Sequence, residues 1–218
     1  MNAGGDQRSR TRARVGEKRS TVPLILASAS PRRRSLLTDA GFSFQVMPAD
    51  IDEESAVSAI TDPVAQARQL AFLKARAVAD RLAAGVVLGA DTLVSAGLLN
   101  TRPPADAADA RRILTELMHL PHDVITGFAL IDAATGESEV YDELTRLHMR
   151  PMAPQELDAY IASGLWQGKA GAYGVQDHDD AFVTHLDGSF SNVVGLPVKT
   201  VAAALARRGI HPCDPGSA

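Results

Sequence analysis

The chain has 218 residues, 45% of them hydrophobic, which is enough for one sizeable core in either a single large domain or two lobes. The formal net charge of −4 argues against duplex nucleic acid as the main ligand, and a lone cysteine excludes an internal disulfide and a zinc cluster built from thiolates. Because no apolar run reaches the roughly 18 residues of a membrane span, and the first residues lack the apolar core of a secretory signal, we expect a soluble, cytoplasmic protein.

The charge is uneven along the chain. Residues 1–20 carry six basic and two acidic side chains, a net charge of +4, which leaves −8 for the remainder. Residues 1–21 have almost nothing to bury, so we expect a disordered basic tail before one folded domain at 22–212, and a short second tail at 213–218. The first tail is either a contact for a polyanion or an extension without a role.

The first expected elements are a buried strand over Leu24–Ala27 and a helix that follows it. Ser30 is a suitable N-cap, because its hydroxyl can accept hydrogen bonds from the first helical turn. Pro31 then occupies the first helical position, where a missing N–H is tolerated. Gly41 is placed to end the helix in a left-handed conformation.

Three arginines, Arg32, Arg33 and Arg34, fill the first turn of this helix. Cations are unfavourable at a helix N-terminus, which already carries partial positive charge. A bound anion would resolve the conflict, and the serines Ser28 and Ser30 add hydroxyls suited to a phosphate chain. Successive helical residues lie about 100° apart, so we favour Arg32 and Arg33 as ligands. The alternative is a solvated basic turn.

The next segment contains an alternating strand pattern at 42–47 and an acidic run at 50–54. Asp62 and Pro63 then begin a long helix, as N-cap and first helical residue. Lys74 lies on the apolar stripe of this helix. A lysine there either meets an anion or extends past its own stem to water.

The short apolar run that begins at Gly85 is interrupted at Gly89 and ends in a carboxylate, that of Asp91. We interpret it as a buried strand that delivers a carboxylate to the mouth of a sheet, where sites in α/β proteins lie. The alternative is an aspartate that initiates a turn.

The rest of the chain alternates further strands and helices, which predicts an α/β fold with a mixed sheet. In order, we expect a helix from Asp106 to His119, strands at His122–Leu130 and Glu139–Met149 joined at Thr135-Gly136, a helix at Pro154–Ser163 that Gly164 ends, a glycine-rich segment at Gly168–Tyr173, a strand at Phe182–Leu186 and a closing helix at Lys199–Arg207. Trp166 either packs against the glycine-rich segment or stacks on a nucleobase.

Five blocks of sequence resemble, in order, the motifs of the Maf (septum formation inhibitor) family of nucleotide pyrophosphatases. They are Leu-Ala-Ser-Ala-Ser-Pro-Arg-Arg-Arg-Ser-Leu-Leu at 26–37, Asp52-Glu53 with Leu-Ala-Phe-Leu-Lys-Ala at 70–75, Gly-Ala-Asp-Thr at 89–92, Lys-Ala-Gly-Ala-Tyr-Gly-Val-Gln at 169–176, and Gly-Ser-Phe-Ser-Asn-Val-Val-Gly-Leu-Pro at 188–197. The resemblance spans 24 to about 205. It implies an elongated central sheet flanked by helices, with two lobes around a deep groove, similar to inosine triphosphatase.

The resemblance also implies metal-dependent hydrolysis of nucleoside triphosphates to the monophosphate and pyrophosphate. The implied roles are Asp91 as general base, Glu53 and Asp91 as carboxylates for Mg²⁺ or Mn²⁺, Lys74 as a phosphate contact, Ser28, Ser30 and Arg33 as the phosphate cradle, and Arg32, Thr92 and Gln176 as substrate-selecting residues. The block at 169–176 is similar to the branch that acts on dTTP and UTP, with CTP or modified pyrimidine nucleotides as further substrates, rather than to the branch that prefers 7-methyl-GTP. Family members often form homodimers.

The chain departs from the family pattern at three places. Arg102 stands where a Gly-Lys-Pro lysine is usual, and the two cations are not equivalent at a metal and phosphate site. The segment Met118–His122 keeps only the histidine of the usual Ser-Gly-x-x-His. Asp177–Asp180 replaces a glycine and is either a solvated acidic loop or a set of metal ligands.

A non-enzymatic function is the alternative to hydrolysis. In that case the chain would be a regulator of septum formation that binds a nucleotide or nucleic acid through Arg32–Arg34 and the basic tail. A measurement of nucleotide hydrolysis distinguishes the enzyme from the regulator, because a protein that only binds would leave the triphosphate intact. A role in clearing modified nucleotides or arresting division follows from analogy with the family alone.

Overall fold

A computed structural model describes residues 22–97, 99–176 and 182–213 of the chain. The basic tail predicted at 1–21, the acidic run Asp177–Asp180 and residues 214–218 of the second tail lie outside the described residues. None of the described helices is both long and apolar enough to cross a membrane.

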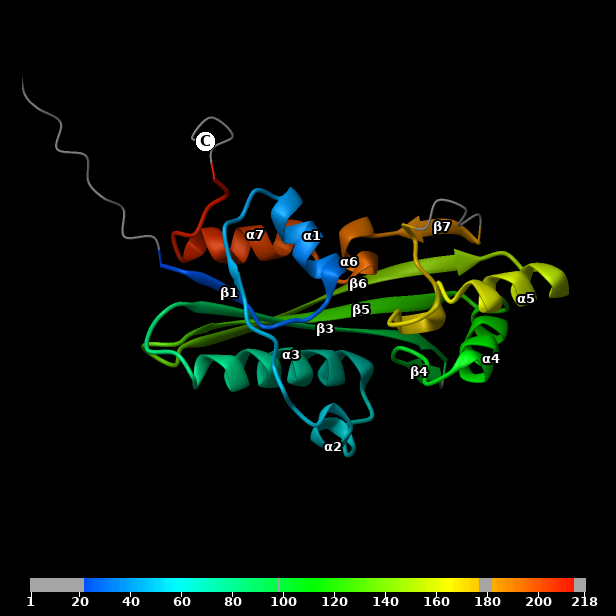
Figure 1. Ribbon diagram of the computed structural model, residues 1–218, viewed down its shortest axis with the longest axis horizontal. Helices are drawn as coiled ribbons and strands as arrows, with labels where there is room; N and C mark the ends of the chain where they lie inside the picture. The colour runs from blue at the N-terminus through cyan, green and yellow to red at the C-terminus, as the bar shows by residue number, and fades with distance from the viewer. Residues whose placement is uncertain (1–21, 98, 177–181, 214–218) are drawn as a thin grey trace, which may run out of the picture.

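In the part of the chain that the structure describes, seven strands form one elongated, mixed sheet (Figure 1). The sequence predicts the mixed sheet, and the family resemblance implies its elongation. The strands are β1 (Leu24–Leu26), β2 (Gln45–Val46), β3 (Val86–Ala96), β4 (Leu99–Thr101), β5 (His122–Asp132), β6 (Ser138–Met149) and β7 (Val183–Asp187). Their order is β2-β1-β3-β5-β6-β7, with β4 paired to β3 outside this path. β1 is parallel to β2 and β3, and the other pairs are antiparallel.

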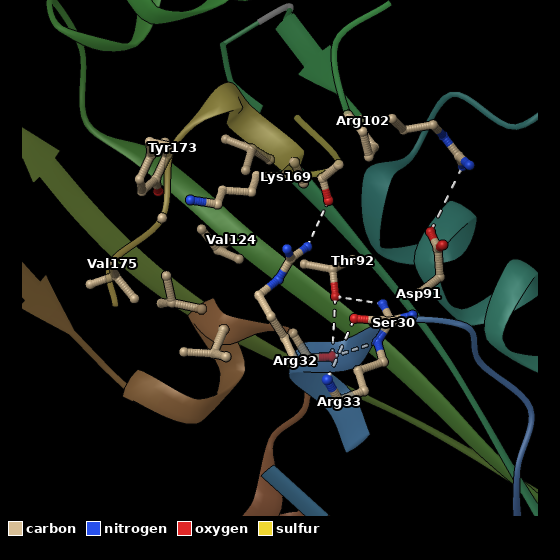
Figure 2. Close-up of a pocket in the computed structure, with 18 of the residues that line it drawn as sticks. Ser30, Arg32, Arg33, Asp91, Thr92, Arg102, Val124, Lys169, Tyr173 and Val175 are labelled. Carbon is tan, nitrogen blue, oxygen red and sulfur yellow. Dashed lines mark hydrogen bonds and ion pairs between the residues drawn. The ribbon is translucent and has the colours of Figure 1, made fainter. Parts of the chain in front are cut away.

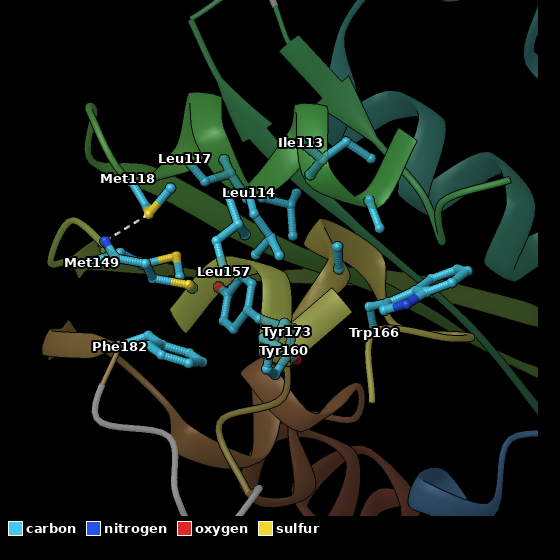
Figure 3. Close-up of a cluster of buried hydrophobic side chains, with 14 of the residues drawn as sticks. Ile113, Leu114, Leu117, Met118, Met149, Leu157, Tyr160, Trp166, Tyr173 and Phe182 are labelled. Atoms are coloured by element: carbon cyan, nitrogen blue, oxygen red, sulfur yellow. Dashed lines mark hydrogen bonds between the residues drawn. The ribbon is translucent and has the colours of Figure 1, made fainter. Parts of the chain in front are cut away.

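Helices cover both faces of the sheet and form a second lobe at one end (Figure 1). They are α1 (Pro31–Asp39), α2 (Glu53–Val57), α3 (Pro63–Ala79), α4 (Ala107–Leu117), α5 (Pro154–Ser163), the 3₁₀ helix η1 (Ala170–Ala172), α6 (Phe190–Val194) and α7 (Val198–Arg207). α3 lies on one face of the sheet, and α1 and α7 lie on the other. The second lobe packs α4, α5 and η1 around a separate apolar cluster that includes Leu114, Tyr160 and Trp166 (Figure 3).

Local signals for helix ends are confirmed by the structure. The Ser30 hydroxyl accepts a hydrogen bond from the Arg33 N–H at 3.4 Å, and Asp62 caps α3 through the Ala65 N–H at 2.7 Å. Gly41 and Gly164 follow their helices with φ of +80° and +71°, a conformation that favours glycine.

The structure corrects the interpretation of Asp91. β3 does not end in this carboxylate but continues to Ala96, and Asp91 pairs with Gly127 of β5 in the middle of the strand. Asp91 therefore lies neither at the mouth of the sheet nor in a turn. The interruption at Gly89 has a steric reason, because a Cβ there would lie 2.3 Å from the Ala71 carbonyl oxygen. α3 therefore packs directly on β3.

Candidate functional site

A pocket of about 210 Å³ lies where the two lobes meet, and nine of the ten site residues predicted from the sequence line it. They are Ser30, Arg32, Arg33, Glu53, Lys74, Asp91, Thr92, Arg102 and Gln176. The tenth, Ser28, is buried behind the pocket wall. Its hydroxyl accepts hydrogen bonds from Arg33 Nη1 and from the Ser30 N–H, both at 3.2 Å. Ser28 therefore holds Arg33 and does not face the pocket itself.

Four charged side chains form one network at an end of the pocket. Lys74 Nζ lies 2.8 Å from Glu53 Oε1 and 2.8 Å from Asp91 Oδ1. Arg102 donates through Nη1 to Glu53 Oε2 at 3.0 Å, and its Nη2 lies 3.9 Å from Asp91 Oδ2. The lysine side chain is only 12% exposed. The sequence left open whether Lys74 meets an anion or extends to water. The structure shows that it meets anions, and these are carboxylates of the chain itself.

Asp91 keeps one oxygen available for a ligand. Its side chain is 7% exposed, and Oδ2 is buried without a hydrogen-bond partner. A buried carboxylate oxygen without a hydrogen-bond partner is unfavourable, so this oxygen suits a water molecule or a cation that the pocket admits. Among the described residues no three His, Cys, Asp or Glu side chains form a group that could hold a metal. Glu53 and Asp91 are therefore the carboxylates at this site that could hold one.

The three arginines of the first turn of α1 point in different directions, as helical geometry predicts. Arg33 donates to the Gly195 carbonyl at 2.8 Å, to Ser28 Oγ and to Thr92 Oγ1 at 3.1 Å, so it joins α1 to β3 and α6. Burial lowers the pKa of Arg33 from its ordinary value, and the nearby Asp91 opposes this effect. Arg32 donates through Nη2 to the Gly168 carbonyl at 2.6 Å, across the pocket, whereas Arg34 is exposed on the outer face.

The other end of the pocket combines apolar side chains with the amine of Lys169 (Figure 2). It is lined by Val94, Val124, Val193 and Val194, and by the segment 168–176. Lys169 and Tyr173 of this segment were not assigned roles from the sequence, although the glycine-rich block that contains them was noted. Trp166 does not line the pocket, and its indole N–H donates to the Ile161 carbonyl at 3.0 Å. The prediction that Trp166 packs within the protein is therefore confirmed, and the alternative that it stacks on a nucleobase is wrong.

His122 is the first residue of β5 and lies next to Tyr173, outside the pocket lining. It is 1% exposed, and its Nε2 is 2.7 Å from the Tyr173 hydroxyl oxygen. Burial lowers the pKa of His122 to about 4. The folded protein therefore keeps this ring neutral at pH values where the unfolded chain, with a histidine pKa of about 6.5, already binds a proton.

This difference in proton binding makes stability depend on pH. Since the unfolded state gains the proton first, the free energy of unfolding should fall as pH is lowered, by about 2 kcal/mol between pH 7.5 and pH 5. Urea denaturation at several pH values measures it. In the variant His122→Leu this part of the pH dependence should vanish; an unchanged slope would assign it to other groups.

The fold and this pocket define a class of protein: an α/β protein whose site combines basic side chains with paired carboxylates, as enzymes that act on phosphorylated ligands do. Residues 23–208 match the family described as Maf-like protein, and the chain belongs to this family.

Curated relatives cover nearly the same region. The chain is 41% identical over 186 residues to the dTTP/UTP pyrophosphatase of Syntrophomonas wolfei subsp. wolfei, covering 85% of this chain and 97% of that protein. It is 42% identical to the protein of the same name from Citrifermentans bemidjiense, over 84% of this chain and 93% of the relative, and 43% identical to that from Moorella thermoacetica, over 86% and 95%.

A solved structure has a similar fold. The HAM1 protein from Coxiella burnetii superposes with a TM-score of 0.50 at 15% identity, over 86% of this chain and 100% of that chain. At this identity the likeness concerns the fold alone. It agrees with the elongated α/β fold that the family resemblance implied.

Proposed function

We propose that this chain hydrolyses UTP and dTTP to the nucleoside monophosphate and pyrophosphate, with a divalent cation and with Asp91 as general base. The observation that carries the proposal is the Oδ2 of Asp91, which is buried without a hydrogen-bond partner beside Lys74 and Arg102 in a basic pocket. The names of the relatives, all dTTP/UTP pyrophosphatases, support this choice of substrate.

The charge of the pocket suits a triphosphate. Its lining contains five basic side chains, namely Arg32, Arg33, Lys74, Arg102 and Lys169, against the two carboxylates of Glu53 and Asp91. The protein as a whole carries −4. The positive charge is thus concentrated where a polyphosphate would bind, and phosphates placed there would gain charge-assisted hydrogen bonds.

The two ends of the pocket have different proposed tasks. The phosphates would lie over Lys74, Arg33 and Arg102. The guanidinium of Arg33 has five N–H groups, and the three bonds to protein oxygens leave two for a ligand. The nucleoside would lie toward Val124 and the segment 168–176, where Gln176 offers an amide to a base.

Asp91 would act on the attacking water. Its Oδ2 can accept a hydrogen bond from a water molecule and then take its proton, while Lys74 remains bound to Oδ1 and offsets the negative charge. Basic groups around the phosphates would stabilise the charge that develops as the phosphoanhydride bond breaks.

The carboxylates present fit Mg²⁺ or Mn²⁺. These ions are commonly held by one or two carboxylates together with waters and substrate phosphates, and Glu53 and Asp91 provide that number. When bound, the cation would supply additional positive charge at the phosphates. Arg102 contacts both carboxylates, so it would compete with a cation for them.

A panel of nucleotides distinguishes the proposed hydrolysis from the alternative, a non-enzymatic regulator that binds a nucleotide without cleaving it. UTP, dTTP, CTP, ATP, GTP and 7-methyl-GTP are each incubated with the protein and Mg²⁺ or Mn²⁺, and pyrophosphate and phosphate are measured separately. We expect pyrophosphate, fastest from UTP and dTTP. Binding without turnover would instead favour the regulator, and release of single phosphates would mean a different bond is cleaved. The homodimer and the cytoplasmic location stay predictions.

A further inference from the structure

Seven of the pocket-lining residues belong to one short segment, 168–176. Its backbone adopts unusual conformations. Gly168 and Gly171 have φ of +65° and +73°, and Ala172 has φ of +64°. Ala172 is the one non-glycine residue with positive φ among those that the structure describes. A residue in this region of φ and ψ persists when its surroundings hold it there, and such strain is concentrated at functional sites.

The segment is packed tightly between its neighbours. A Cβ added at Gly171 would lie 2.9 Å from Val94 Cγ2 and 2.9 Å from the ring of Tyr173. Tyr173 in turn lies within the apolar cluster of the second lobe, which also contains Trp166 (Figure 3). The shape of this side of the pocket therefore depends on where the Tyr173 ring is held.

Polar side-chain contacts link Gly168 and Tyr173 of the segment to other elements. Arg32 donates to the Gly168 carbonyl. Tyr173 meets His122, with the Tyr173 hydroxyl oxygen 2.7 Å from Nε2 and the two ring centroids 5.5 Å apart at an interplanar angle of 75°. His122 itself does not line the pocket.

We propose that His122 is a positioning residue that acts through Tyr173 to hold the segment 168–176 in the strained conformation that shapes the nucleoside end of the pocket. The proposal rests on the proposed function, because it assigns the affinity for the nucleotide in part to a residue that does not touch it. It also explains why a polar ring occupies this fully buried place, which an apolar side chain would fill without needing a partner.

Neutrality of the ring is part of this role. The charged or titratable groups near His122 are Asp123 on the same strand, His148 on β6 and Tyr173. A neutral imidazole can accept a hydrogen bond from the tyrosine hydroxyl through Nε2, whereas a protonated ring can only donate. The bond between the two side chains is thus available in either direction at neutral pH.

The experiment compares four variants in steady-state hydrolysis of UTP. His122→Leu and Tyr173→Phe each remove the bond, and each should raise KM about five- to tenfold while kcat changes less than about twofold. The double variant should be no worse than the worse single variant, because both changes remove the same bond. His122→Gln, which retains a polar atom for the tyrosine, should recover KM to within about twofold of the wild type.

Two measurements separate positioning from a general loss of stability. Leu130→Val alters another buried residue of β5 that does not line the pocket, and it should leave KM unchanged. Trp166, the single tryptophan of the chain, reports directly on the neighbouring segment. Acrylamide quenching of its fluorescence should increase in His122→Leu and Tyr173→Phe, and not in Leu130→Val.

The proposal is overturned if KM rises equally in Leu130→Val, if the effects of the two single variants multiply in the double variant, or if quenching of Trp166 is unchanged. Tyr173→Phe keeps the packed ring and supplies the test even if His122→Leu does not fold. If the wild-type protein fails to hydrolyse UTP, the proposed function falls, while the quenching comparison still decides whether His122 holds the segment.

Discussion

Replacing Asp91 with asparagine should lower the turnover rate with UTP by about 10²–10⁴-fold. The change keeps the size of the side chain but removes its negative charge and its affinity for a proton. KM should change little or decrease, because a negative charge near the phosphates is removed. Steady-state kinetics at fixed Mg²⁺ measures both constants.

A matched variant controls for the chemical change itself. Asp142→Asn makes the same substitution on β6, where the carboxylate pairs with Arg68 and does not line the pocket. Its rate should equal that of the wild type. If Asp91→Asn kept a rate within about threefold of the wild type, the proton would have to go to another group.

Replacing Arg33 with alanine should weaken the binding of UTP by more than about tenfold, since each charge-assisted hydrogen bond to the phosphates contributes roughly 1.5–3 kcal/mol. The same change removes three hydrogen bonds to Ser28, Thr92 and Gly195. The melting temperature should therefore decrease as well. Isothermal titration with a non-hydrolysable UTP analogue and thermal unfolding measure the two effects.

Arg34→Ala is the control for this prediction, because Arg34 is the next residue of the helix but points to solvent. It should alter neither affinity nor melting temperature appreciably. Equal losses in Arg33→Ala and Arg34→Ala would mean that the charge of the turn as a whole, and not the contacts of Arg33, attracts the nucleotide.

Much of the fold could be predicted because its signals are local. Ser30 before Pro31, and Asp62 before Pro63, mark helix starts within two residues. The short elements α2, β4 and α6 were not predicted, because a helix of five residues or a strand of three does not display a full period of hydrophobicity.

The sequence predicted which residues form the site, but it did not predict which of them contact one another. The resemblance supplied Glu53, Lys74 and Asp91, yet the ion pairs among them depend on how α2 packs on α3 and how α3 packs on β3. Gly89 was visible in the sequence, but its close contact with α3 was not. His122 and Tyr173 are 51 residues apart, so no local pattern could indicate their contact.

The most direct test of the assignment of Asp91 is a titration of Mn²⁺ at saturating UTP into the wild type, Asp91→Asn and Glu53→Gln. If Glu53 mainly holds the cation, its variant should need more Mn²⁺ for half-maximal rate, and excess Mn²⁺ should largely restore that rate. Asp91→Asn should stay at least about 100-fold below the wild type at every Mn²⁺ concentration, because a cation cannot replace the missing base. Recovery of Asp91→Asn to near the wild-type rate would mean that Asp91 only helps to hold the cation, and it would contradict the role of Asp91 as the base.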